Sequence, residues 1–255
     1  MNAVIVVFML AMGLAVGSFL NVCIYRLPRH ESVMFPGSHC TVCDRSLDWF
    51  ENLPLASWLV LRGRCRTCRT PIPVQYPLVE AITAAVFVSA YFIYGWTPLL
   101  AARLLFACAM IVLFVIDLQH RILPNVITLP GIVIGVLFSF FLPPGWRSSL
   151  IGVLAGGGVL FAIAEAYYRL RGYEGLGMGD VKMLAMIGAF LGWPLMIVTL
   201  VLSSFSGSIV GVGLLVSRRG DMKAALPFGT FLAVGALVAA VAGDAFLDWY
   251  LAFYR

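Results

Sequence analysis

The chain has 255 residues, of which 62% are hydrophobic and only 11% are charged. A soluble domain carries roughly 25% charged residues, so this composition excludes an ordinary soluble protein and indicates an integral membrane protein. The net charge of +5 is interpreted as an excess of basic residues in cytoplasmic loops beside the lipid bilayer, with no nucleic-acid partner.

The predicted fold class is an all-α polytopic membrane protein with about eight transmembrane helices, because apolar stretches long enough to span recur along the chain. One span each is expected over residues 2–22, 76–95, 99–116, 126–142, 148–168 and 226–248. Two more crossings are expected within 181–216, which allows roughly 17 residues per crossing where a straight span needs roughly 20. The turn between them is placed either at Gly192-Trp193-Pro194 or at residues 203–208.

The first span, residues 2–22, has no basic segment before its apolar run and no obvious cleavage site of small residues. It is therefore interpreted as a retained helix and not as a removed signal peptide. Gly13 and Gly17 lie four residues apart and could let a neighbouring helix approach closely. Glycine is also common in membrane spans for no specific reason, and so short a pattern leaves both interpretations open.

Residues 23–75 form the one sizeable polar insert, and they are strongly basic. Arginine occupies positions 26, 29, 45, 62, 64, 66 and 69, against acids at positions 31, 44, 48 and 51. Loops rich in arginine and lysine stay in the cytoplasm, so we expect the insert on the cytoplasmic side and both termini outside.

Four of the six cysteines lie in this insert as two C-x-x-C pairs, Cys40 with Cys43 and Cys65 with Cys68. Thiols on the cytoplasmic side stay reduced, so the paired spacing predicts a zinc site in preference to disulfides or unrelated thiols. Four thiolates complete the tetrahedral coordination of zinc and leave no position open for water. The metal would therefore fold the insert and take no part in catalysis.

Two acids lie where apolar segments meet, Asp117 after the third span and Asp180 before the sixth. A carboxylate within a span costs about 2.5–3.5 kcal/mol at the helix centre, so two of them suggest a site. Two close carboxyl groups can share one proton, one acting as base and the other as acid, and peptide hydrolysis by an activated water needs both. The sequence therefore predicts a catalytic pair.

The residues around Asp180 are assigned supporting roles. Gly177 and Gly179 would permit backbone conformations closed to other residues and let a substrate strand approach. Lys182 could pair with Asp180 or with a lipid phosphate. Each acid also has an ordinary interpretation, Asp117 as a solvated helix end and Asp180 as the cap of the following helix.

Gly177-x-Gly179-Asp180-Val181-Lys182, with the earlier Ile116-Asp117 leading to Leu123-Pro124, resembles the bacterial type IV prepilin peptidases, which are GxGD aspartyl proteases of the membrane. The resemblance covers nearly the whole chain. It includes the two cysteine pairs and the segments Gly17-Ser18-Phe19-Leu20-Asn21-Val22, Tyr25-Arg26-Leu27-Pro28, Trp49-Phe50-Glu51-Asn52-Leu53-Pro54, Arg62-Gly63-Arg64-Cys65, Tyr76-Pro77-Leu78-Val79-Glu80 and Leu226-Pro227-Phe228-Gly229.

The resemblance implies an enzyme of the bacterial inner membrane that removes the leader of type IV prepilins and type II secretion pseudopilins at the cytoplasmic face. The catalytic pair falls on Asp117 and Asp180. Many members carry a further acid shortly after the first, and here that position is Asn125. Members with the cysteine insert also methylate the new N-terminal amine with S-adenosylmethionine, whose site the sequence leaves unassigned.

The domain organisation that follows is a first helix over 1–22, a zinc-binding insert over 23–75 and a seven-helix peptidase domain over 76–255. Two other classes of function stay open from the residues alone. A proton-coupled transporter would use the two acids as a relay, although transporters usually show internal repeats and none is convincing here. An assembly protein would bind partners through the zinc-binding insert, and Asp117 and Asp180 would then have only a structural role. The oligomeric state is not predicted.

Overall fold

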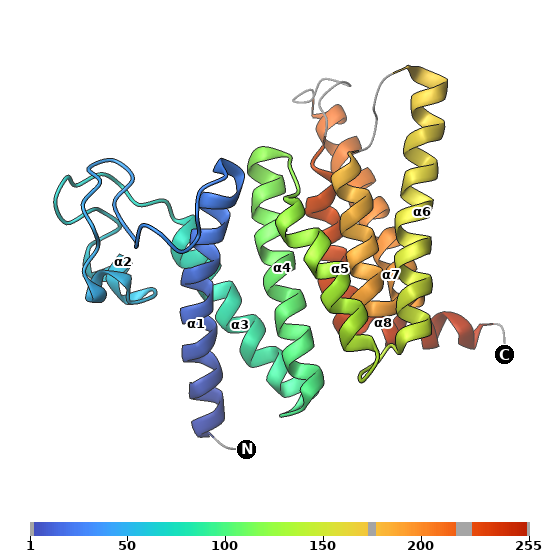
Figure 1. Cartoon of the computed structure of the whole chain (residues 1–255), viewed down its shortest axis with the longest axis horizontal. Helices are drawn as coiled ribbons and strands as arrows, with labels where there is room; N and C mark the ends of the chain where they lie inside the picture. Colours follow the sequence, from blue (N-terminus) through green and yellow to red (C-terminus); the bar gives the residue numbers. More distant parts are fainter. Residues whose placement is uncertain (1–2, 173–176, 218–225, 254–255) are drawn as a thin grey trace. The chain divides into compact units, whose positions relative to one another are not determined.

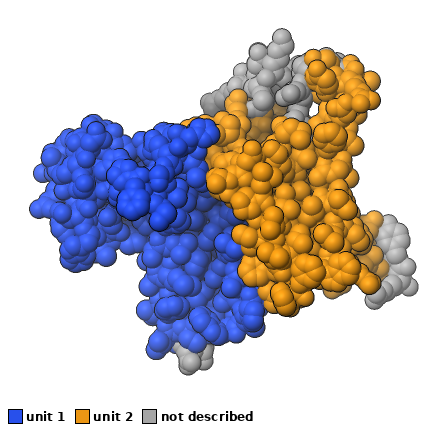
Figure 2. Space-filling view, in the orientation of Figure 1, with its two compact units in different colours: residues 1–112 blue, residues 113–255 orange. Residues whose placement is uncertain are grey.

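The computed structural model describes residues 3–172, 177–217 and 226–253, and within these residues the chain is mainly helical (Figure 1). Two isolated β-bridges join His39 to Ser46 and Arg64 to Pro71. The predicted all-α fold class is confirmed. Contacts divide the chain into two compact units, residues 1–112 and residues 113–255 (blue and orange in Figure 2). The predicted boundaries after residues 22 and 75 stay a prediction.

Six of the described helices are long and apolar enough to cross a membrane. They are α1 (Ala3–Arg26), α3 (Gln75–Tyr94), α4 (Pro98–His120), α6 (Trp146–Arg171), α7 (Met178–Val216) and α8 (Phe228–Ala252). A seventh apolar helix, α5 (Asn125–Ser139), is shorter. Length and composition alone do not fix the number of crossings, so the count of eight stays a prediction.

In the first unit, α1 and α3 pack against each other through glycine. A Cβ on Gly13 would lie 2.6 Å from Ala84 Cα, and one on Gly17 would lie 2.7 Å from Glu80 Cα. Neither position has room for any larger residue unless the helices separate. Of the two interpretations of this glycine pair, close helix approach is the one that the structure bears out.

α1 continues to Arg26, four residues beyond the predicted end of the first span at residue 22. Pro28 is the first residue that disfavours the helix, and Leu27–Arg29 form the short 3-10 helix η1. The buried Arg26 guanidinium donates to the carbonyls of Ser32 (2.9 Å) and Gly37 (3.1 Å), which fastens the start of the insert to the helix end. The remaining elements of the insert are η2 (Trp49–Asn52) and α2 (Ala56–Val60).

In the second unit, the first part of α7 runs antiparallel to α6. A Cβ on Gly156 would lie 2.9 Å from the carbonyl oxygen of Leu184, and one on Gly192 would lie 2.5 Å from Ser148 Oγ. A later residue of α6 thus contacts an earlier residue of α7, and an earlier residue of α6 contacts a later one, which means that the two helices run in opposite directions. Glycines at this crossing bring the two backbones together.

The second part of α7 packs on a different helix. A Cβ on Gly243 of α8 would lie 2.6 Å from Leu195 Cδ2, and one on Gly235 would lie 2.5 Å from Ser203 Oγ. This part of α7 therefore runs antiparallel to α8, as the ribbon view also shows (Figure 1).

α7 and α8 begin at the same end of the second unit, because Leu123 lies against both Gly179 and Gly229. α8 runs away from that end and the second part of α7 runs back toward it, so the chain reverses direction between the two parts. The reversal lies at Gly192, whose φ of 79° and ψ of 171° are not helical. Of the two turn positions left open by the sequence, Gly192-Trp193-Pro194 is the one found.

Candidate functional site

Asp117 lies within α4 and not in the connection after it, which corrects the predicted end of that helix at residue 116. No helix breaker occurs before Arg121, whose φ of 55° ends the helix and whose N–H donates to Asp117 O (2.8 Å). The Asp117 side chain is 4% exposed, and its Oδ2 accepts hydrogen bonds from the backbone N–H (2.7 Å) and Oγ1 (2.9 Å) of Thr230 at the start of α8. It is therefore not a solvated helix-end acid.

Asp180 is the third residue of α7 and is 9% exposed. Because it lies inside the first turn, it does not occupy the capping position that precedes a helix. Its N–H donates to Gly177 O (3.1 Å), and its carboxyl group lies within electrostatic range of Asp117. The partial positive charge of a helix N-terminus favours an anion at this position.

Leu123 packs against glycines that lie next to both acids. A Cβ on Gly179 would lie 2.9 Å from Leu123 Cβ, and one on Gly229 would lie 2.9 Å from Leu123 Cδ1 and 3.0 Å from Asp117 Oδ2. Gly179 lies in regular helix, so close packing and not an unusual backbone conformation requires glycine there. At Gly177 a Cβ would make only an ordinary 3.6 Å contact with Asp180 Oδ2.

Lys182 has a partner that the sequence did not suggest. Its Nζ donates to Asn125 Oδ1 (3.0 Å), between a half-buried lysine at the start of α7 and an exposed asparagine at the start of α5. The resemblance implies a further acid near this position in many members of the family, and here the residue is an amide. The amide here accepts from the lysine without adding a negative charge beside the two aspartates.

Thr230 and Gly229 are the parts of this site that the sequence did not single out. They lie 113 and 112 residues after Asp117, so no local spacing links them to it. The one available signal was the segment Leu226-Pro227-Phe228-Gly229, which directly precedes Thr230.

The four paired cysteines lie together as a cluster in the insert. All four Sγ atoms lie within 4.8 Å of one another, and Cys40 Sγ and Cys68 Sγ are 3.7 Å apart. Sulfurs at 2.3 Å from a tetrahedral zinc would be separated by about 3.8 Å. The cluster, Cys40, Cys43, Cys65 and Cys68, therefore fits a tetrahedral metal.

The two C-x-x-C pairs form matching turns. The N–H of Cys40 donates to Arg45 O, and the N–H of Cys65 donates to Thr70 O, each at 2.9 Å. The residue after the second cysteine of each pair has positive φ, 54° in one turn and 59° in the other. Hydrogen bonds with Thr70 lower the pKa of Cys68 to about 6, whereas, despite a backbone hydrogen bond with Arg45, the pKa of Cys43 is raised to about 11 by desolvation and by its sulfur neighbours.

A charged pair braces the first of these turns. Arg45 Nη2 donates to both carboxylate oxygens of Glu51, at 2.6 and 2.7 Å, and Asp48 N–H donates to Glu51 Oε2 at 2.9 Å. The hydrogen bond from Arg45 holds the pKa of the Glu51 carboxyl below its usual range. The pair fixes η2 against the turn that carries Cys40 and Cys43.

The chain matches two family models, the bacterial peptidase A24 N-terminal domain over residues 11–94 and the type IV leader peptidase family over residues 104–212. Similar curated proteins are each called prepilin leader peptidase/N-methyltransferase. The one from Aeromonas hydrophila is 39% identical over 94% of this chain and 91% of its own length. The one from Pseudomonas aeruginosa is 34% identical over 95% of this chain and 92% of its own length.

A third relative, from Myxococcus xanthus, is 40% identical over 83% of this chain and 63% of its own length. No solved structure matches the chain. The two family models cover both the cysteine insert and the two aspartates, and the Aeromonas and Pseudomonas relatives align over nearly the full chain. The chain therefore belongs to the type IV leader peptidase family.

Proposed function

We propose that this integral inner-membrane protein cleaves the leader from type IV prepilins and type II secretion pseudopilins and N-methylates the new terminus, with Asp117 and Asp180 as the catalytic pair. The observation that carries this proposal is the pair of buried carboxyl groups, brought into electrostatic range by α4 and α7. The relatives called prepilin leader peptidase/N-methyltransferase support both halves of the activity.

Two carboxyl groups in this arrangement can carry out amide hydrolysis. The ionised carboxylate takes a proton from water, whose oxygen attacks the carbonyl carbon, while the protonated carboxyl gives its proton to the carbonyl oxygen. Collapse of the resulting diol breaks the C–N bond: the leaving amine takes the proton that came from water, and a diol hydroxyl returns its proton to the carboxylate that had acted as the acid. Thr230 would hold Asp117 in position through its two hydrogen bonds.

The cysteine cluster is proposed to hold one structural zinc through Cys40, Cys43, Cys65 and Cys68. The sulfur separations support this assignment. The metal would supply a tetrahedral cross-link between the two turns. All four of its positions would be taken by protein, so it has no part in the cleavage step.

Methylation would follow cleavage on the freed amine. S-adenosylmethionine supplies an electrophilic methyl group, and its transfer to a neutral amine leaves a neutral thioether and releases one proton. The protein has to exclude water from this reaction and hold the peptide's new terminus. The methylated product would carry one methyl group more than the cleaved peptide.

The active site is proposed to face the cytoplasm, with both termini in the periplasm. The arginines of the insert support this orientation, because basic loops are retained inside. Alkaline phosphatase fused to the C-terminus is expected to be active, and green fluorescent protein at the same place to be dark. The opposite pattern would reverse the proposed topology.

The test of function is to incubate the purified protein with a prepilin-like peptide and S-adenosylmethionine and to measure the product masses. Asp117→Asn and Asp180→Asn are each expected to lower cleavage by about 10²–10⁴-fold, the usual contribution of one acid–base group. Both should still methylate a peptide supplied already cut. Asp244→Asn, which changes an exposed acid on α8, is the matched control and should cleave normally. Full cleavage by either of the first two variants would remove that residue from the pair.

A further inference from the structure

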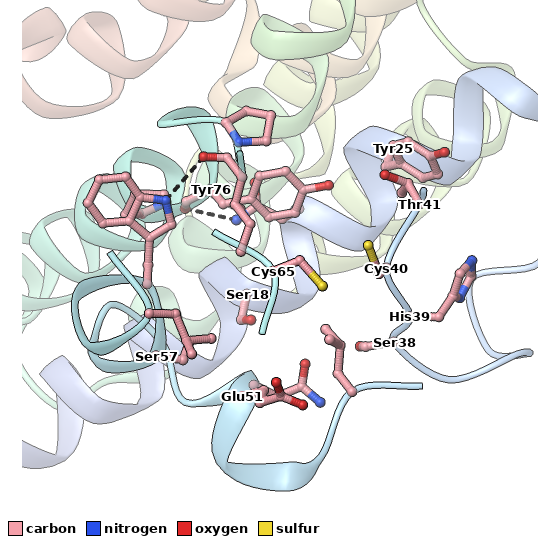
Figure 3. A pocket seen from close by; sticks show the side chains of 18 of the residues that line it. Ser18, Tyr25, Ser38, His39, Cys40, Thr41, Glu51, Ser57, Cys65 and Tyr76 are labelled. Carbon is pink, nitrogen blue, oxygen red and sulfur yellow. Dashed lines mark hydrogen bonds between the residues drawn. The ribbon is translucent and has the colours of Figure 1, made fainter. Parts of the chain in front are cut away.

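A cavity of about 200 Å³ lies in the first unit, between the insert and the adjoining ends of α1 and α3 (Figure 3). Tyr25 and Tyr76 border it from the helices, and Cys40 and Cys65 border it from the insert. None of the catalytic residues proposed above lines it. The residues that carry the following argument are Asn21, Trp58, Arg66, Tyr76 and Glu80.

Asn21 presents an unused acceptor to this cavity. Its side chain is 3% exposed, and its Nδ2 donates to the carbonyl oxygen of Tyr76 at 3.0 Å. This bond fixes the orientation of the amide, because a flipped amide would place two oxygens against each other. Among the described residues Oδ1 has no partner, and buried polar atoms in folded proteins nearly always have one. A ligand with an N–H group would satisfy it.

Glu80 adds a negative charge to the same wall. It is 7% exposed, and its Oε2 accepts a hydrogen bond from the N–H of Leu55 at 2.8 Å. The Ser18 side chain also hydrogen-bonds to it. These partners are neutral, and no salt bridge joins Glu80 to a described cation, whereas Glu51, the other carboxylate at the cavity, is paired with Arg45. Glu80 is therefore the carboxylate that a cationic ligand would meet.

Aromatic and basic side chains complete the lining. Trp58 is held by a hydrogen bond from its Nε1 to Ile72 O (3.3 Å), and Tyr76 contributes a second ring. Such rings attract cations through their faces and stack on planar bases. Arg66 could meet a carboxylate, although it also lies 3.5 Å from Asp48. The cavity thus suits a ligand with cationic groups, N–H donors, an aromatic ring and a carboxylate.

We propose that this cavity binds S-adenosylmethionine, with Asn21 Oδ1 accepting from one of its N–H groups and Glu80 facing its positive charge. The inference rests on the proposed methyl transfer and gives that reaction a location. The cluster of thiolates beside the cavity would carry a net negative charge with one zinc bound, which further favours a cationic ligand. Methyl donor and catalytic aspartates then lie on different compact units of the chain.

The test measures binding directly, by titration calorimetry of the full-length protein in detergent with S-adenosylmethionine. Asn21→Leu and Glu80→Gln are each expected to raise Kd about tenfold, the usual effect of losing one buried polar contact. Thr83→Val is the matched control, because Thr83 is buried on the same helix as Glu80, its Oγ1 donates to Val79 O within that helix, and it does not line the cavity. Its Kd should equal that of the wild type.

Photo-crosslinking of radiolabelled S-adenosylmethionine provides a second readout, with labelled peptides expected from residues 18–26 and 55–80. Zinc content and melting temperature of each variant establish that it is folded. Folded variants with wild-type Kd, or label only in residues 113–255, would overturn the cavity as the site while leaving methylation by the wild type intact. A wild type that cleaves but neither binds the donor nor methylates would overturn the methyl-transfer half of the proposed function as well.

Discussion

The insert and the first part of α7 position their functional groups differently: α7 is densely packed, whereas the insert has few buried residues. Every residue from 183 to 192 is buried, whereas between residues 30 and 74 only Glu51, Gly63 and Cys65 are buried. The helical region positions Asp180 through dense apolar packing and glycine contacts. The insert has no comparable core, so its cysteine turns need a metal and hydrogen bonds to hold them. The two regions should therefore fail under different perturbations.

Metal removal is expected to have the largest effect, and it should be confined to the insert. Cys65→Ser, or a chelator, should release about one zinc per chain and abolish amide protection across residues 40–72, since structural zinc sites contribute about 10–16 kcal/mol in zinc-finger peptides. Protection across 183–192 should persist. Elemental analysis and hydrogen exchange measure the two outcomes. If residues 40–72 and 183–192 lost amide protection equally, the metal would not stabilise the insert alone, and the proposed difference between the two regions would be wrong.

A second perturbation affects the helical region and leaves the insert unchanged. A larger residue is introduced where glycines of α6 and α7 are in contact. A Cβ on Gly188 would overlap the carbonyl of Gly152, and Gly188→Leu is expected to cost about 1–3 kcal/mol or more by overpacking. Gly158→Ala on α6 is the control, because a Cβ there meets nothing within 4 Å. That substitution should be neutral or slightly stabilising. Thermal unfolding measures both, and zinc content should not change in either.

Loss of the Thr230 hydroxyl should have a smaller and more specific effect. Thr230→Val removes one of the two donors to Asp117 and keeps the backbone N–H, so kcat for leader cleavage is expected to fall about tenfold with little change in KM. Thr230→Ser retains the oxygen and should restore kcat. If serine fails to restore the rate, the hydroxyl does not act through its hydrogen bond to Asp117.

Much of this arrangement could be predicted because its signals are local. Long apolar stretches indicate where the membrane helices lie. The repeated C-x-x-C spacing, at Cys40 with Cys43 and at Cys65 with Cys68, indicates the metal site. Asp117 and Asp180 stand out because acids are rare in apolar segments. The ends of the helices were less predictable, and Asp117 lies inside α4 since no breaker occurs until Arg121.

The contacts that complete each site could not be predicted, because they join distant segments. Nothing in the spacing of Asp117 and Thr230 indicates that α8 begins beside α4. The bond between Lys182 and Asn125 likewise depends on how α5 and α7 meet. Asn21 appears in the sequence as a polar residue near a helix end, and only the fold shows its unpaired oxygen at a cavity.

The smallest expected effect concerns the charged pair that braces the insert. Glu51→Gln keeps the shape of the side chain but removes its charge, so it should weaken the hydrogen bonds from Arg45 without removing them. Zinc affinity, measured by competition with a chelator, is expected to fall only about twofold to fivefold, because the amide that replaces the buried Glu51 carboxylate can still accept from the partly exposed Arg45. Glu31→Gln, an exposed acid of the same insert, should leave the affinity unchanged. If Glu51→Gln instead released zinc as completely as Cys65→Ser, hydrogen bonding and not the metal would be what folds the insert.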